Sequence, residues 1–203
     1  MPHPASALPA ARRTRPTLLA AVAGTALLGT LGFPSVAGWS SSLASSASSA
    51  SSASSADGVV PDGVTVYDDE YPAVARLDPA LLAALRRTAT DAASDGVVLY
   101  VNGGWRSAAY QEKLLDDAVA EYGSREEAAR WVATPTTSAH VSGDAVDIGH
   151  GEATAWLSEH GAAYGLCQIY ANEPWHYELR PDAVASGCPA PYADPTQDPR
   201  MQP

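Results

Sequence analysis

The chain has 203 residues and a net charge of −11, with 12 Lys and Arg against 23 Asp and Glu. This length suggests one ordinary domain with an added segment. The strongly acidic balance argues against nucleic acid or an anionic membrane surface as the main partner.

Residues 1–37 are predicted to be a secretory signal or an N-terminal anchor. Three arginines precede an apolar run at residues 18–33, and the small residues Ser35-Val36-Ala37 follow it. This order is typical of an export signal that is cut by signal peptidase. We therefore expect an exported, extracytoplasmic protein, with an uncleaved membrane anchor as the alternative.

The rest of the chain divides by composition into three parts. We predict a flexible linker at residues 38–57, because residues 40–56 are almost entirely Ser and Ala, which cannot build a packed core. Residues 58–190 are predicted to form the folded domain. The segment 191–203 is rich in Pro and polar residues and is predicted to be a flexible tail.

Helices are predicted where apolar residues recur at helical spacing, and strands where β-branched and aromatic residues run together. In chain order these are a short strand or ordered arm at 64–67, a helix at 79–93, a strand at 97–101, helices at 108–122 and from 124 through 131, a strand at 145–148, a helix at 152–164, and strands at 166–170 and 175–179. Asp78, Ser107 and Ser124 are predicted helix caps, and residues 102–104 are predicted to turn the chain.

The predicted helices and strands are intermixed, and a turn at 172–174 joins the last two strands as a hairpin. This order predicts an α+β fold, with a small, mainly antiparallel sheet flanked by helices. A Pro-containing loop at 134–137 would deliver Ser138 and His140 to one side of that sheet.

Two stretches carry the residues of a metal site. The first runs from Ser138 through His140 to Asp147, and the second is Glu173-Pro174-Trp175-His176. A catalytic zinc site needs three nitrogen or oxygen ligands and a fourth position open for water. We therefore predict that Zn²⁺ is held by His140, Asp147 and His176, called here the His-Asp-His triad.

Glu173 and Arg106 are the predicted catalytic residues beside this triad. Glu173 would lie on the hairpin turn and act as general base on the attacking water. An apolar wall such as Trp175 would hold its pKa up. Arg106 follows a Gly-Gly turn, and its planar guanidinium would pair with the free carboxylate of a substrate.

The chain has two cysteines, Cys167 and Cys188. An even pair in an exported domain favours a disulfide. This bond would tie the segment before Glu173 to the tail after His176 and brace the second metal-binding stretch.

The two metal-binding stretches resemble the motifs of a known family. Ser138-x-His140-x-x-Gly143-x-Ala145-x-Asp147, followed by Glu173-x-x-His176, is similar to the VanY-type D-alanyl-D-alanine carboxypeptidases. That family is related to the VanX-type D-Ala-D-Ala dipeptidases and shares a zinc-binding fold with hedgehog amino-terminal domains. Gly104-Trp105-Arg106-Ser107, with Gln111 after it, resembles the family's Gly-Tyr-Arg-Ser…Gln segment, with Trp in place of Tyr.

The resemblance covers residues 97–179 and implies a function and further site residues. It implies zinc at the His-Asp-His triad, Glu173 as catalytic base, and Arg106 as a contact to substrate or transition state. Ser138 and Gln111 would contact the terminal D-Ala. Independently of the resemblance, Trp175 is predicted to line the substrate site as a pocket wall. The implied partner is a peptidoglycan stem peptide ending in D-Ala-D-Ala, and we expect a monomer.

Several alternatives stay open from the sequence. The same zinc site would serve a peptidoglycan endopeptidase or a D,D-dipeptidase, and a zinc-braced wall-binding domain without catalysis is the alternative from another class. Glu173 could be a solvated turn residue and Arg106 a surface ion-pair residue. Helix capping or simple exposure would explain Ser138 and Gln111, and His150 and His160 receive no role.

Overall fold

The computed structural model describes residues 53–149 and 151–202. The predicted signal at 1–37 and most of the predicted linker lie outside the described residues, as does His150. Within the described ranges, none of the helices has the length and apolar character that a membrane span requires.

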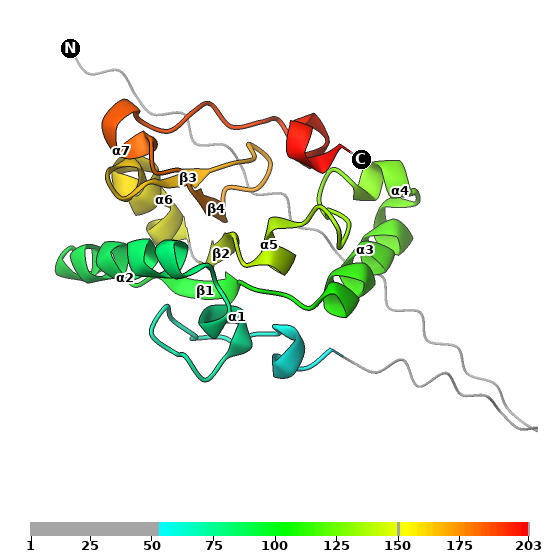
Figure 1. The fold of residues 1–203 in the computed structure, drawn as a ribbon, viewed down its shortest axis with the longest axis horizontal. Coiled ribbons are helices and arrows are strands. Elements are labelled where there is room, and N and C mark those ends of the chain that lie inside the picture. Colours follow the sequence, from blue (N-terminus) through cyan, green and yellow to red (C-terminus); the bar gives the residue numbers. More distant parts are fainter. Residues whose placement is uncertain (1–52, 150, 203) are drawn as a thin grey trace, which may run out of the picture. The chain divides into compact units, whose positions relative to one another are not determined.

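The described residues fold into an α+β domain, as predicted (Figure 1). Its α-helices are α1 (Pro72–Ala75), α2 (Pro79–Ser94), α3 (Ala108–Tyr122), α4 (Arg125–Ala128), α5 (Ala139–Ser142), α6 (Gly151–His160) and α7 (Ala183–Ser186). Its 3-10 helices are η1 (Ser55–Asp57), η2 (Gly161–Tyr164), η3 (Pro195–Gln197) and η4 (Pro199–Met201). Its strands are β1 (Tyr100–Gly103), β2 (Ala145–Gly149), β3 (Leu166–Gln168) and β4 (His176–Leu179).

The strands form one antiparallel sheet in the order β1-β2-β4-β3. Because side chains alternate along a strand, each strand presents two different faces. Val146 and Ile148 of β2 and Tyr177 of β4 belong to the main hydrophobic core. Asp147 and His176 occupy the alternate positions of the same strands and so point to the opposite, polar face.

Helices α2 and α6 cover the apolar face of this sheet (Figure 1). Leu81 and Leu85 of α2 and Leu157 of α6 are at most 2% exposed. Full burial of one such side chain stabilises the fold by roughly 1.5–3 kcal/mol. This layer therefore holds β2 and β4 in place, and the polar face above them remains available for a site.

Two predicted caps are present at the ends of long helices. The Asp78 side chain accepts hydrogen bonds from two backbone amides at the start of α2, and the Ser107 side chain accepts one at the start of α3. The predicted helix at 152–164 is α6 followed by η2, and it ends at Gly165 with a φ of 77°. Ser124 caps α4 as predicted, but α4 ends at Ala128 and does not reach residue 131.

The strand predicted at 97–101 was wrong in its bounds. β1 begins at Tyr100 and continues through Gly103, so it includes most of the predicted turn. Val98 is 47% exposed, whereas Leu99 is 1% exposed and packs in the core. The apolar run at 97–101 therefore reflects the burial of Leu99 and Val101 and not a continuous strand.

The structure describes the last residues of the predicted linker, 53–57, and the predicted tail through residue 202, and both segments make contacts with the domain. The linker ends in η1, where the Asp57 carboxylate accepts a 3.1 Å hydrogen bond from the Ser107 hydroxyl. In the tail, Asp194 and Asp198 are 6% and 0% exposed, and Arg130 pairs with Asp194 at 3.0 Å. These acidic residues find basic or hydroxyl partners from distant parts of the chain, which composition alone does not reveal.

Candidate active site

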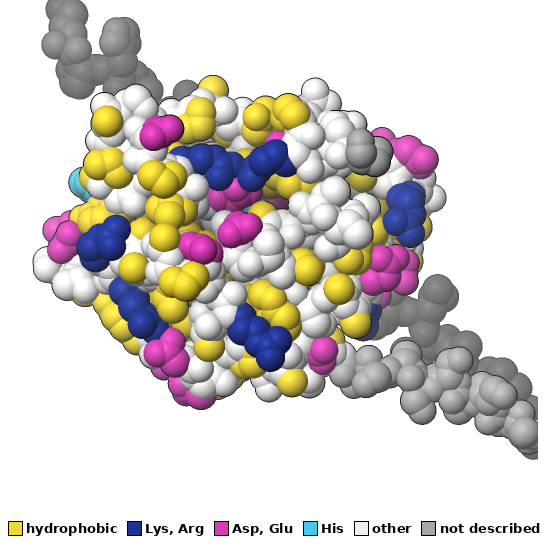
Figure 2. Space-filling model, in the orientation of Figure 1, with side chains coloured by type: hydrophobic (Ala, Val, Ile, Leu, Met, Phe, Trp, Pro, Cys, Tyr) yellow, Lys and Arg dark blue, Asp and Glu magenta, His cyan; other side chains and the backbone are white. Residues whose placement is uncertain are grey.

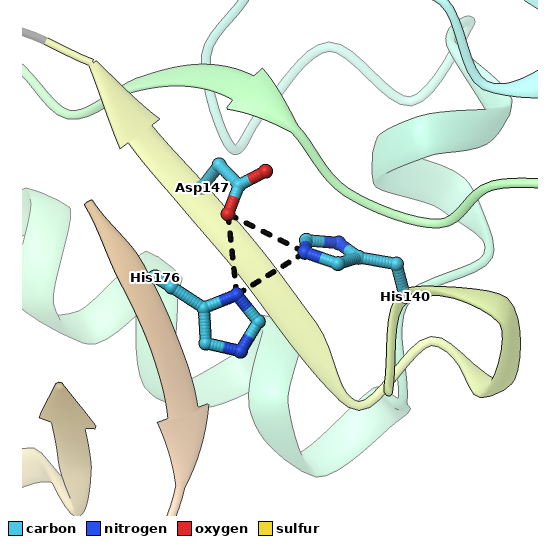
Figure 3. Close-up of side chains that lie close together, drawn as sticks. All are labelled: His140, Asp147 and His176. Carbon is cyan, nitrogen blue, oxygen red and sulfur yellow. Dashed lines mark hydrogen bonds and ion pairs between the residues drawn. The ribbon is translucent and has the colours of Figure 1, made fainter. Parts of the chain in front are cut away.

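The His-Asp-His triad comes together on the polar face of the sheet (Figure 3). Asp147 of β2 and His176 of β4 are direct antiparallel partners, so their side chains stand next to each other. His140 comes from the one-turn helix α5, just before β2. All three side chains are buried.

Two glycines make this convergence sterically feasible. Gly143 ends α5 with a φ of 86°, and a Cβ there would lie 2.5 Å from the carbonyl oxygen of Arg76. The chain can thus turn sharply between His140 and Asp147. A Cβ at Gly103 would lie 2.7 Å from Oδ2 of Asp147, so glycine leaves room for this carboxylate.

The spacing of the three facing atoms fits a tetrahedral zinc ion. Nε2 of His140 lies 3.2 Å from Nδ1 of His176, and each of these atoms lies 3.3 Å from Oδ1 of Asp147. Zinc bonds of about 2.0–2.1 Å at tetrahedral angles separate neighbouring ligand atoms by about 3.3–3.4 Å. The donor set and its spacing therefore both suit zinc.

Hydrogen bonds on the outer side of each imidazole fix which nitrogen faces the centre. Nδ1 of His140 lies 2.9 Å from the carbonyl oxygen of Gly104, which can only accept, so Nε2 keeps its lone pair. Nε2 of His176 lies 3.4 Å from Oε1 of Glu178, which favours the lone pair on Nδ1. Two nitrogen lone pairs and a carboxylate oxygen then face one point, an arrangement that a cation stabilises.

The electrostatics of the triad agree with a cation site. Burial would raise the pKa of Asp147, but His140 and Arg106 hold it well below its ordinary value. Burial lowers the pKa of His140.

His176 behaves differently from His140. Burial would lower its pKa, but hydrogen bonds with Asp147 and Glu178 raise it to about 9. Without a cation His176 is therefore protonated at neutral pH. A metal ion must displace this proton, so metal affinity should weaken as the pH falls.

Glu173 lies on the loop between β3 and β4, with Oε2 3.8 Å from Nδ1 of His176. It is 6% exposed, and its Oε1 has no hydrogen-bond partner among the described residues. Burial raises the pKa of Glu173 to about 7. A carboxylate with this pKa can accept a proton and return it near neutral pH.

Arg106 lies beside the triad and is held by two contacts. Its Nη2 donates to Oδ2 of Asp147 at 2.5 Å, and its Nη1 donates to Oε1 of Gln111 at 3.3 Å. Gln111 is 1% exposed, and its amide nitrogen donates to the carbonyl oxygen of Ala133 at 2.9 Å. Gln111 therefore orients Arg106, in addition to any contact with a substrate.

A pocket of about 440 Å³ opens over the triad and includes every predicted site residue except the cysteines. Ser138 lines it and is 7% exposed, and its side chain makes no capping hydrogen bond to α5. Trp175 also lines it and is 40% exposed, so this ring is a wall that a ligand can contact. On the face drawn in Figure 2, acidic and basic side chains are interspersed.

The predicted disulfide between Cys167 and Cys188 is present, with a Cα–Cα distance of 5.6 Å. Cys167 lies on β3 directly opposite Glu178 of β4. The disulfide ties β3 to the chain that leads into the C-terminal segment.

Three residues near the site are absent from the sequence-based prediction: Tyr170, Glu178 and Arg200. Glu178 could have been found, because it lies two residues after His176 on a strand and must share its face. The Tyr170 ring lies 5.1 Å from the His176 ring, and Arg200 pairs with Glu178 at 2.7 Å. The position of Arg200 depends on how the tail folds back, which no local pattern indicates.

Comparisons with known proteins agree with this geometry. The model of the family described as VanY, D-alanyl-D-alanine carboxypeptidase, matches residues 74–182. A D-alanyl-D-alanine carboxypeptidase of Enterococcus faecalis is 35% identical over 111 residues, covering 42% of this chain and 41% of that protein. The chain thus spans less than half the length of this curated relative.

Two solved structures resemble the domain. VanYB in complex with D-alanine-D-alanine is 29% identical, with a TM-score of 0.50 over 55% of this chain and 74% of that chain. The LdcB LD-carboxypeptidase is 24% identical, with a TM-score of 0.51 over 63% of this chain and 70% of that chain, and shows the shared fold.

Proposed function

Because the chain belongs to the VanY family of D-alanyl-D-alanine carboxypeptidases, we propose that it removes the terminal D-Ala from peptidoglycan stem peptides with the help of zinc. The convergence of the His-Asp-His triad, with 3.2–3.3 Å between facing atoms, carries this proposal. The relative of known structure that was solved with D-alanine-D-alanine supports the substrate class.

The chemistry needs a polarised carbonyl and an activated water. Zinc held by the triad would act as a Lewis acid on the scissile carbonyl and lower the pKa of the attacking water. Glu173, whose Oε1 lacks a partner among the described residues, would take a proton from that water. It would then deliver this proton to the leaving amino group of the terminal D-Ala.

Other pocket residues would orient the peptide. The Arg106 guanidinium would pair with the terminal carboxylate of the substrate or stabilise the developing oxyanion. Gln111 holds this guanidinium from behind through the 3.3 Å hydrogen bond. Ser138 and Trp175 line the same pocket and would contact the terminal residue.

Mass spectrometry of a stem pentapeptide incubated with the zinc-loaded protein tests this function. We expect the loss of a single D-Ala. Loss of a D-Ala-D-Ala dipeptide would identify a D,D-dipeptidase instead, and cleavage inside the stem would identify an endopeptidase. An unchanged peptide would support the zinc-braced wall-binding alternative.

We also propose that the protein works outside the cytoplasm. Residues 1–37 would direct export, residues 38–57 would link the signal to the domain, and the domain would act as a monomer. The disulfide supports this location, because such bonds persist in oxidising compartments. Analysis of the mature N-terminus would show whether the signal is cut near Ala37.

A further inference from the structure

We propose that the C-terminal segment, residues 192–202, positions the metal ligand His176 through contacts that run from Arg200 to Glu178 to His176. The family match ends at residue 182, so this segment lies outside the matched region. The inference rests on the proposed metal-binding role of His176 and adds a positioning device to it.

The first step is the contact between Glu178 and His176. Both residues are on β4, two positions apart, and so share the polar face of the sheet. Glu178 is 1% exposed, and its Oε1 lies 3.4 Å from Nε2 of His176. A carboxylate behind a metal-binding imidazole fixes the orientation of the ring and makes it a stronger ligand.

The second step is the grip of Arg200 on Glu178. Nη1 of Arg200 donates to Oε2 of Glu178 at 2.7 Å, and Nη2 donates to Oε1 at 3.2 Å. Arg180 also pairs with Oε2, at 2.7 Å. Arg200 therefore differs from Arg180 in holding Oε1, the oxygen that faces His176.

The third step is the anchoring of Arg200 within its own segment. Asp198 is fully buried, and both of its carboxylate oxygens lie 3.1 Å from Nε of Arg200. Asp198 also accepts a 3.1 Å hydrogen bond from the hydroxyl of Tyr170, whose ring packs against His176. Within the segment, Arg200 thus holds the Glu178 carboxylate and Asp198 holds Tyr170, and both of these groups contact His176.

The C-terminal segment is itself fastened to the domain at several points. Tyr192 forms a bridge with Tyr170, Asp194 pairs with Arg130, and Cys188 fastens the chain just upstream. Figure 1 shows the segment in red on the side of the sheet that faces α4. Pro195 and Met201 line the same pocket as the triad, so the segment is part of the wall of the site.

The test compares zinc affinity in Arg200→Gln with that of the wild type, measured by competition with a chromophoric chelator and without substrate. Loss of the carboxylate that contacts a metal-binding histidine typically weakens metal affinity by about 10–100-fold. Arg200 acts through that carboxylate, so we expect Arg200→Gln to raise the Kd by clearly more than twofold. Arg125→Gln is the matched control, because the only described polar contact of the Arg125 side chain is a 3.7 Å surface pair with Glu112. Its Kd should stay within twofold of the wild type.

A double-mutant cycle with Glu178→Gln shows whether Arg200 acts through Glu178. The double variant should bind zinc about as weakly as Glu178→Gln alone. If the two substitutions raise the zinc Kd by independent factors that multiply in the double variant, Arg200 does not act through Glu178 and the proposal is overturned. An Arg200→Gln Kd within twofold of the wild type would also overturn it. Arg200→Lys keeps the charge but loses the bidentate contact, and should restore part of the affinity.

Further controls distinguish a loss of folding, or a failure of the proposed function, from a loss of the role of the C-terminal segment. Thermal unfolding of the metal-free variants reports any general loss of stability. If Arg200→Gln does not fold, Arg200→Lys takes its place in the cycle, and a Kd equal to that of the wild type would then overturn the proposal. A wild type that fails to bind zinc would reject the proposed function, whereas equal binding by the wild type and Arg200→Gln would reject only the role of the segment.

Discussion

Glu173 can be changed without altering the His-Asp-His triad, so its substitution separates catalysis from metal binding. In Glu173→Gln the side chain keeps its size but cannot take the proton from water. We expect turnover of a stem pentapeptide to fall by about 10²–10⁴-fold, while zinc affinity changes little. Product release and zinc competition measure the two quantities.

Glu126→Gln is the control for this experiment, because Glu126 is an exposed residue of α4 that lies away from the pocket. It should retain wild-type turnover. Wild-type turnover in Glu173→Gln with zinc bound would show that another group activates the water.

The pH dependence of the reaction should reflect the same carboxylate. Burial raises the pKa of Glu173 from 4.5 to about 7. Below this pKa the group is protonated and cannot act as a base, so activity should increase with pH. A bound cation adds positive charge and lowers this pKa, so the acid limb of kcat/KM should lie between about 4.5 and 7. An increase that begins only above pH 7 would contradict this assignment.

At the residue scale, the sequence predicts the candidate site well because its motifs are local. His140 and Asp147 lie within one short stretch, and Glu173 and His176 within another. The contacts of Arg106 were harder to predict. Its ion pair with Asp147 joins residues 41 positions apart, and the sequence does not show which carboxylate the guanidinium meets.

Among the elements, the turn from α5 to β2 is the most sensitive to substitution. Gly143 has a φ of 86°, and an added Cβ would lie 2.5 Å from the carbonyl oxygen of Arg76. Gly143→Ala therefore combines an unfavourable left-handed conformation with a clash. We expect it to lower the free energy of unfolding by about 3 kcal/mol or more and to weaken zinc binding, because His140 and Asp147 flank the turn.

Gly123→Ala is a matched control for this turn. Gly123 ends α3 with a φ of 85°, and a Cβ there would meet nothing within 4 Å. It should cost only the left-handed conformation, about 1–2 kcal/mol, and leave zinc affinity unchanged. Urea denaturation and zinc competition on both variants measure the difference, and equal costs would show that the clash at Gly143 is relieved.

At the element scale, the helices with strong caps were predicted most accurately. α2 and α3 begin where Asp78 and Ser107 indicate, because a capping side chain satisfies backbone amides within its own turn. β1 was misplaced because a strand depends on its neighbour. Its pairing with β2 extends to Gly103, a residue whose composition favours a turn.

For the molecule as a whole, zinc should act as a stabilising ligand. The triad joins α5, β2 and β4, so a bound ion links elements that separate on unfolding. At a free zinc concentration about 1,000 times the Kd, the free energy of unfolding should rise by about 4 kcal/mol. Calorimetry with and without a chelator measures this change, and His140→Ala should abolish it. A melting temperature that does not respond to zinc would contradict the site.

At the scale of the molecule, composition predicts the acidic character of the domain. It does not predict that residues near both ends of the described part form hydrogen bonds and ion pairs with the domain. The linker residue Asp57 and the tail residues Asp194 and Asp198 look like solvated polar residues in the sequence. In the structure each is bonded to a residue more than ten positions away, namely Ser107, Arg130 and Tyr170. Such pairs become visible only once the sheet brings distant segments together.

The most direct test is diffraction at the zinc absorption edge from crystals of the domain grown with zinc. We expect one anomalous peak at about 2.0–2.2 Å from Nε2 of His140, Oδ1 of Asp147 and Nδ1 of His176. A peak elsewhere, or none at these three atoms under saturating zinc, would contradict the proposed metal site and the hydrolysis that depends on it.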